Sequence, residues 1–335
     1  MKQLSLTLII VSSVLIVFLL LRLLHKQDFK LQVNPKSNIS YLGYFPSEDE
    51  FIDNSQLMVV RADIEEDIVI VWNQGNQSLY QFDLQGKYIR TVTKRGHGPG
   101  EVLYVSGIAL DNGYIVLNDQ AKFMFHLYDY SGNFIRSVEY RETILMDIAY
   151  SHPFLIGQNA LSISDDIKNE HSVAYIYNLE NGELVSDVSL DLNHFNPNNR
   201  MVNLVATNQH FLLAPKAGKK VYKLEASSGK LKNVYEFSGY DFDNLRERLT
   251  NLFDFSSPNL IIDMVSDESG YLLAVNGTAR KVLRMDSDFN LVDILRFEDS
   301  ISFYENEYLR SISAAGNQLY ILNGQGDGII HIFNY

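Results

Sequence analysis

The chain has 335 residues, no cysteine and a formal net charge of −13. Residues 31–335 hold 40 of the 41 acidic side chains but only 24 of the 28 basic ones, and such an excess of negative charge repels nucleic acid and anionic membrane surfaces. Nucleic acid is therefore not expected as a partner. The lack of cysteine excludes disulfide bonds and an N-terminal lipidated cysteine.

The first 30 residues form a unit of their own. No charged side chain lies between Leu4 and Leu21, and this run is just long enough to cross the hydrocarbon core of a bilayer as a helix. A cleaved signal peptide would have a shorter apolar run and small residues at its cleavage site, but residues 25–29 offer no such site. We expect residues 1–30 to be an uncleaved transmembrane signal anchor and residues 31–37 to be a linker.

From residue 38 onward, short apolar strands recur in sets of four, bounded by Gly, Asn and Asp. One recurring turn has Gly at positions 86, 132, 182 and 229, and its fifth copy has Phe289 in place of Gly. A repeat of roughly 40–50 residues built from short strands is typical of a β-propeller, in which each repeat is one blade. The pattern predicts an all-β, six-bladed propeller of four-stranded blades over residues 38–335.

The last set of strands is incomplete. It supplies three strands before Tyr335, whereas residues 39–44 form a strand-like segment upstream of the first blade. Pairing this segment with the last set would join the two ends of the ring and cover an exposed sheet edge. We therefore expect an N-terminal strand to close the propeller.

Residues 240–255 break the β pattern. Their apolar side chains recur at helical spacing, at Phe242, Leu245, Leu249, Leu252 and Phe253. This predicts a short amphipathic helix inserted between the fourth and fifth blades. Such a helix could pack flat on the rim, which is the more ordinary arrangement, or cover the central funnel as a lid.

A Gly-rich string lies between the first two blades and contains Gly96, His97, Gly98, Pro99, Gly100 and Glu101. Glycine permits positive φ and close backbone approach, and Pro99 stiffens the crossover. Backbone N–H groups in such a loop can hold a carboxylate, for which Glu101 is the candidate. A phosphate-binding loop is not expected, because no Lys-Ser/Thr pair and no helix follow.

Residues 94–138 resemble an NHL-type propeller repeat. The string G-x-G-P-G-E and the overall layout are similar to the bacterial six-bladed, TolB-like propellers, over most of residues 38–335. The resemblance implies an extracytoplasmic propeller, often tethered to the membrane and usually without known catalysis. The basic residues Arg22, Lys26 and Lys30 slightly favour a cytoplasmic domain, but we give the resemblance more weight. The expected location is the inner (cytoplasmic) membrane, with a periplasmic propeller.

The sequence contains no Gly-x-Ser-x-Gly elbow, no His-Glu-x-x-His motif and no Cys/His metal spacing. Candidate ligand-binding or channel residues are His97 in the crossover and four polar residues on or next to predicted innermost strands: Glu101, Asp147, Asn203 and Asp263. Asp147 and Asp263 interrupt apolar runs, so we expect them to point into the channel.

Three functions stay open at this point. The first is a non-catalytic module that binds a small ligand, a peptide or a partner protein. The second is a metal-assisted hydrolase or lyase of the calcium type, which would use carboxylates at the central channel. The third is a purely structural scaffold. No catalytic residue and no cofactor is expected for the first, and calcium would serve the second.

Overall fold

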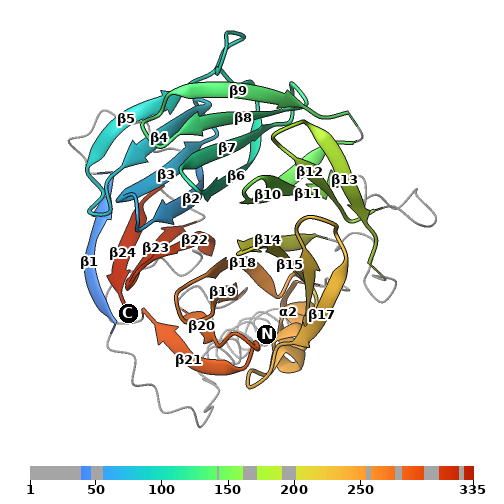
Figure 1. Cartoon of the computed structure of the whole chain (residues 1–335). Helices are drawn as coiled ribbons and strands as arrows, with labels where there is room; N and C mark the ends of the chain where they lie inside the picture. The colour runs from blue at the N-terminus through green and yellow to red at the C-terminus, as the bar shows by residue number, and fades with distance from the viewer. Residues whose placement is uncertain are drawn as a thin grey trace, which may run out of the picture. The chain divides into compact units, whose positions relative to one another are not determined.

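The computed structural model describes residues 39–46, 56–141, 143–160, 172–190, 201–253, 258–275, 281–297, 309–323 and 328–335. Within these ranges, 24 strands form six antiparallel, four-stranded sheets arranged around a common axis (Figure 1). The predicted six-bladed propeller is confirmed. We number the blades in chain order and describe each from its inner to its outer strand.

Blade 1 consists of β2 (Leu57–Asp63), β3 (Ile68–Asn73), β4 (Ser78–Phe82) and β5 (Tyr88–Thr93). Blade 2 consists of β6 (Val105–Asp111), β7 (Tyr114–Asp119), β8 (Met124–Asp129) and β9 (Phe134–Glu139). Blade 3 consists of β10 (Leu145–Ser151), β11 (Phe154–Asn159), β12 (Ala174–Asn178) and β13 (Glu183–Val188).

Blade 4 consists of β14 (Val202–Thr207), β15 (His210–Pro215), β16 (Lys220–Glu225) and β17 (Leu231–Glu236). Blade 5 consists of β18 (Ile261–Ser266), β19 (Tyr271–Val275), β20 (Lys281–Met285) and β21 (Leu291–Arg296). Blade 6 consists of β22 (Leu309–Ala315), β23 (Gln318–Asn323), β24 (Ile330–Asn334) and β1 (Ser40–Phe45).

The expected closure by an N-terminal strand is confirmed. Strand β1 pairs antiparallel with β24 from Ser40 opposite Asn334 to Phe45 opposite Ile330. Phe45 is 2% exposed, and its ring lies 4.8 Å from the ring of Phe82 in blade 1. The strand therefore completes the last blade, and its final side chain packs on the first blade.

The apolar core is divided among the contacts between neighbouring blades. At the contact of blades 1 and 6, for example, Val60 and Val71 pack with Tyr320 and Leu322. Equivalent clusters join blades 1 and 2, 2 and 3, 3 and 4, and 5 and 6. Each blade is thus stabilised mainly by its neighbours, which makes the closed ring the unit of stability.

The turn that recurs in the sequence adopts a left-handed backbone. Its Gly residues have φ between +67° and +83°, and Phe289 has φ +64° in the fifth copy. A bulky side chain in this conformation costs about 1–2 kcal/mol. The ring of Phe289 is fully buried and stacks on Tyr271 at 4.4 Å, and burial of such a ring contributes about 2–3 kcal/mol. The packing of the Phe289 ring therefore offsets the backbone strain that the glycine of the other copies avoids.

The predicted helix is present as α2 (Phe242–Phe253). Phe242, Leu245 and Leu249 are buried, and the ring of Phe242 lies 5.5 Å from that of Phe237. Arg246 donates a hydrogen bond of 2.9 Å to the carbonyl of Ala217, in the turn between β15 and β16. These contacts place α2 against blade 4, at the rim rather than over the axis (Figure 1).

The predicted anchor over residues 1–30 and the linker over residues 31–37 lie outside the described residues. In the part of the chain that the structure describes, no helix is long and apolar enough to span a membrane.

The closure makes a direct prediction for Phe45. Phe45→Ala should lower the free energy of unfolding by about 3 kcal/mol, because it opens a cavity between blades 6 and 1. Leu42→Ala is the control, since Leu42 lies on the same strand but is 53% exposed, and it should change stability by less than about 0.5 kcal/mol. Urea unfolding of the full chain in detergent measures both. Equal effects of the two substitutions would contradict the closure.

Candidate functional site

The two ends of the propeller differ in the length of their connections. The turns that join first to second strands and third to fourth strands have two to five residues. At the other end, second and third strands, and successive blades, are joined by four to 24 residues, including α2 and the Gly-rich crossover. The inner strands begin at the end of the propeller with the longer connections, so their first residues lie close to those connections.

The inner strands place one equivalent residue each at a single level of the channel. In β2, β6, β10, β18 and β22 the register shifts near the start of the strand, as at Leu57 and Val59 in β2. Just after this level, every inner strand has a buried apolar residue: Val60, Ile108, Ile148, Leu204, Met264 and Ile312. All of these except Met264 belong to the described apolar clusters between blades. Because side chains alternate along a strand, the preceding residues face the axis. We call these the ring residues: Val59, Gly107, Asp147, Asn203, Asp263 and Ser311.

Ring residues connect one inner strand to the next. Asp263 Oδ2 accepts a hydrogen bond of 3.0 Å from the backbone N–H of Ile312 in blade 6. Ser311 Oγ accepts one of 3.4 Å from the N–H of Val60 in blade 1. At Gly107, an added Cβ would lie 2.9 Å from the backbone nitrogen of Ile148, so glycine allows blades 2 and 3 to approach closely. Three of the ring residues, Gly107, Asp263 and Ser311, therefore lie at contacts between neighbouring blades.

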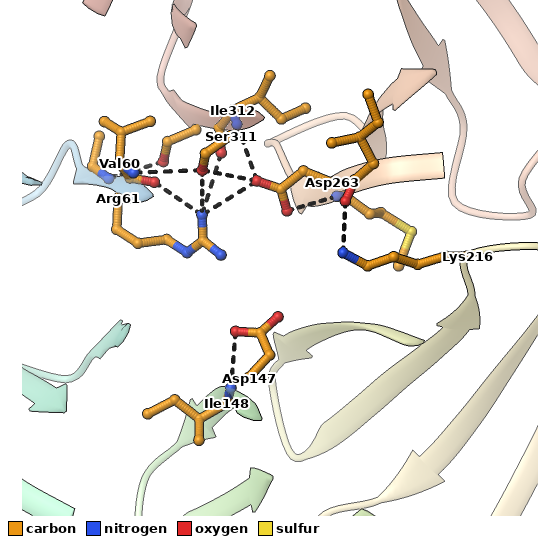
Figure 2. Close-up of polar contacts among 12 residues, drawn as sticks. Val60, Arg61, Asp147, Ile148, Lys216, Asp263, Ser311 and Ile312 are labelled. Atoms are coloured by element: carbon orange, nitrogen blue, oxygen red, sulfur yellow. Dashed lines mark hydrogen bonds and ion pairs between the residues drawn. The ribbon is translucent and has the colours of Figure 1, made fainter. Parts of the chain in front are cut away.

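Both carboxylate oxygens of Asp263, in blade 5, accept hydrogen bonds close to the seam between blades 6 and 1. Its Oδ1 accepts a hydrogen bond from Met264 N at 2.9 Å, and its Oδ2 accepts one from Ser311 Oγ at 2.9 Å. Arg61 Nη1 lies 3.5 Å from the same Oδ2 and donates to Ser311 Oγ at 3.1 Å and to the Val60 carbonyl at 2.9 Å (Figure 2). This network joins blades 5, 6 and 1.

Asp147 occupies the equivalent position in blade 3 but has far fewer contacts. Its Oδ1 accepts a hydrogen bond of 2.9 Å from Ile148 N, and no other partner is found for it in the part of the chain that the structure describes. In Figure 2 its carboxylate points toward Arg61 and Lys216, and no hydrogen bond or ion pair joins it to either. Burial raises the pKa of Asp147, and the negative charge of Asp263 adds to this, while Arg61 and Lys216 act in the opposite direction.

Lys216 reaches the channel from outside the inner strands. It directly follows β15, and its Nζ donates a hydrogen bond of 2.9 Å to the carbonyl of Ile262, beside Asp263. Asn203, the ring residue of blade 4, is 2% exposed, and its Nδ2 has no partner among the described residues. Asp147, Asn203 and Asp263 thus occupy equivalent positions of their inner strands, and Arg61 and Lys216 supply the positive charge that acts on Asp147.

Glu101 and His97 lie apart from this level. Glu101 Oε2 accepts a hydrogen bond of 2.9 Å from Gly98 N, and an added Cβ at Gly96 would come within 1.9 Å of the same oxygen. The expectation that the Gly-rich loop holds the Glu101 carboxylate is confirmed. His97 is exposed in the crossover between β5 and β6. The structure does not bring either residue to the inner strands.

The remaining Gly-rich residues shape the crossover. Gly100 has φ +72°, and its carbonyl accepts hydrogen bonds from Thr93 Oγ1 at 2.6 Å and from the Tyr128 hydroxyl. An added Cβ at Gly100 would lie 2.7 Å from the ring of Phe134. Gly100 therefore connects blades 1 and 2 tightly, beside Pro99 in the same loop.

Sequence reasoning missed Arg61, Lys216 and Ser311. The sequence did contain a signal for Arg61 and Ser311, because side chains alternate along a strand. Ser311 directly precedes a buried residue of its inner strand, and Arg61 follows Val59 by two positions, so both could have been assigned to the channel face. Lys216 had none, since its reach across to blade 5 depends on the turn after β15. In the described ranges, no three or more His, Asp or Glu side chains are grouped so that they could hold a metal ion.

A family model described as a 6-bladed β-propeller, DUF5128, matches residues 54–250. The chain belongs to this family. Its fold is similar to that of a predicted exported protein from Bacteroides fragilis NCTC 9343, with a TM-score of 0.57, 13% identity, and coverage of 88% of this chain and 94% of that one.

It is also similar to the β-propeller domain of Cps50 (Swd1) from Myceliophteria thermophila, with a TM-score of 0.53, 13% identity, and coverage of 89% of this chain and 99% of that one. At this identity the two likenesses show the fold alone. No curated protein matches the sequence significantly.

Asp147 and Asp263 should respond oppositely to the same substitution. A carboxyl whose folded pKa is raised gives stability at low pH that is lost as the pH rises through that raised pKa. Asp147→Asn removes this loss, so it should raise the unfolding midpoint by ~2 °C or more at neutral pH. The gain should shrink as the pH falls toward the ordinary aspartate pKa of 3.8.

Asp263→Asn should lower stability at neutral pH by about 2–3 kcal/mol, because it removes the counter-charge of the largely buried Arg61. Calorimetry of both variants across pH measures the two effects. Destabilisation by Asp147→Asn at neutral pH would contradict the assignment of Asp147 as the unpaired ring carboxyl.

Proposed function

We propose that this chain is a membrane-anchored, extracytoplasmic propeller that acts as a non-catalytic binding module. Its ligand or partner binds at the end of the channel where Arg61, Asp147 and Lys216 face one another. The observation that carries the proposal is the contrast between two equivalent carboxylates, one enclosed in a network and one left with a single hydrogen bond. Polar groups with few protein partners at the end of a channel are typical of a binding site.

Spare hydrogen-bonding capacity supports the same location. Within the described residues, Arg61 uses only Nη1, which leaves Nε and Nη2 without protein partners, and Lys216 uses one of the three N–H donors of its ammonium group. Buried polar groups are normally satisfied by protein or by ordered water, so these donors and the free oxygen of Asp147 suit a polar ligand that displaces water.

The apolar run from Leu4 to Leu21 supports the anchor. The extracytoplasmic location is supported by the resemblance of residues 94–138 to the NHL-type and TolB-like propellers, and by the name of the predicted exported protein from Bacteroides fragilis, which has a similar fold. On this proposal the domain stands on the periplasmic side of the inner membrane.

Binding is favoured over metal-assisted hydrolysis or lysis for a geometric reason. Calcium needs six to eight oxygen ligands at about 2.3–2.6 Å. In the described part of the channel, Asp263 already satisfies protein donors, and a basic side chain stands beside it. Asp147 is the carboxylate left to bind, and it faces two cations.

Ligand-dependent stabilisation tests the binding role. The full chain in detergent is unfolded thermally with the dialysable fraction of a cell extract, with the macromolecular fraction, and with calcium or EDTA. One of the fractions should raise the unfolding midpoint of the wild type and of Lys220→Met, an exposed control, but not of Lys216→Met. No Lys216-dependent shift in either fraction would contradict the proposal. A shift of several degrees with calcium, lost in Asp147→Asn, would favour the metal-assisted enzyme instead.

Reporter fusions test the location. Alkaline phosphatase fused after Tyr335 should be active in a Gram-negative host, because this enzyme folds only where disulfides form. Green fluorescent protein fused at the same position should be dark when exported through the same route. A bright fluorescent fusion with an inactive phosphatase fusion would place the propeller in the cytoplasm.

A further inference from the structure

We infer that the channel ligand is a small monocarboxylate, held by Arg61 and Lys216 and facing Asp147. This inference rests on the proposed binding function and names the class of ligand for the same site. It follows from three features of the described channel: which donors are free, how the charges balance, and which group can exchange a proton.

The free groups are mostly donors. Within the described residues, Arg61 has Nε and Nη2 available, Lys216 has two N–H donors available, and the buried Nδ2 of Asn203 has no partner. The acceptor side consists of one oxygen of Asp147. A ligand that fits this set needs several acceptor oxygens at one end, and a carboxylate offers two in one plane, which suits the flat guanidinium of arginine.

The charge balance of the described side chains favours a ligand with a single negative charge. Among the described residues, the charged side chains that act on the pKa of Asp147 are Arg61 on β2, Lys216 after β15 and Asp263 on β18. With both carboxylates ionised, the four groups sum to zero. With Asp147 protonated, the sum is one positive charge. A monoanion restores neutrality, whereas a cation would face Arg61 and Lys216, and a doubly charged phosphate would exceed the available positive charge.

Asp147 is the group that can supply this proton. Its carboxyl lies in the channel wall, and burial raises its pKa, so it takes up a proton at a higher pH than an exposed aspartate does. A protonated carboxyl can donate an O–H hydrogen bond to a ligand carboxylate, while an ionised one repels it. Binding is therefore coupled to one proton, which resides on Asp147 in the complex, and no covalent bond forms or breaks.

Calorimetric titration of the full chain in detergent with acetate and with glycolate tests the inference. Wild-type affinity should be constant at low pH and fall by up to about tenfold per pH unit above the pKa of Asp147. The titrations run from about pH 5 to about pH 8, which spans the range above an ordinary aspartate. In Asp147→Asn the affinity should be independent of pH.

Two further variants separate the site from the rest of the surface. Lys216→Met should weaken acetate binding about tenfold or more, as expected for loss of a charge-assisted hydrogen bond. Lys220→Met, an exposed lysine on β16, should bind like the wild type. Inorganic phosphate should bind more weakly than acetate to the wild type at neutral pH.

Three results would overturn the inference: no saturable acetate or glycolate binding at high millimolar concentration, unchanged affinity in Lys216→Met, or the same pH dependence in Asp147→Asn and wild type. If carboxylates fail but an extract fraction still stabilises the protein through Lys216, the binding function stands and the ligand class is wrong. If both fail, the proposed binding function is wrong as well.

Discussion

The contact between successive inner strands at the ring level is the constraint on which the rest of the structure depends. A propeller is closed only if its first and last blades are in contact. Here the backbone N–H of Val60 in blade 1 donates a hydrogen bond to Ser311 Oγ in blade 6. Asp263 accepts hydrogen bonds from the Ser311 hydroxyl and from the N–H of Ile312. Arg61 of blade 1 donates a hydrogen bond to Ser311 Oγ and forms an ion pair with Asp263. This network connects the inner strand of blade 6 to blade 1. At the outer edge of the same blade, β1 pairs with β24, so blade 6 is closed on both its inner and its outer side.

The same geometry, repeated in another blade, produces a different chemical outcome. Asp147 has the strand position of Asp263 and the same hydrogen bond to the following N–H, but it lacks the serine and arginine that surround Asp263. Its carboxyl therefore bears the cost of burial without the side-chain hydrogen bonds that Asp263 receives, and this cost raises its pKa against the opposing charges of Arg61 and Lys216. Equivalent positions in a repeat protein can thus separate into a structural role and a binding role by changes in their neighbours alone.

The features that depend on local pattern were predictable from the sequence. Counting strands identified the closure by residues 39–44, apolar spacing identified α2, and polar interruptions of apolar runs identified Asp147 and Asp263. Features that depend on which blades face each other were not predictable: Lys216 lies in a turn, and its partner Ile262 is 46 residues away. Phe289 shows the same limit, because the local preference for glycine gives way to a buried aromatic contact that only the folded blade supplies.

The proposed site depends on one ring carboxyl, Asp147, that makes a single hydrogen bond near Arg61 and Lys216, while the equivalent Asp263 is held by hydrogen bonds between blades. Titration of Asp147 by carbon-13 NMR, with aspartate labelled at the carboxyl carbon and the resonance assigned from Asp147→Asn, is the decisive experiment. We expect a pKa above the ordinary aspartate value of 3.8. A pKa at or below that value would mean that Arg61 and Lys216 pair with Asp147 closely, and it would contradict the assignment of Asp147 as the unpaired ring carboxyl.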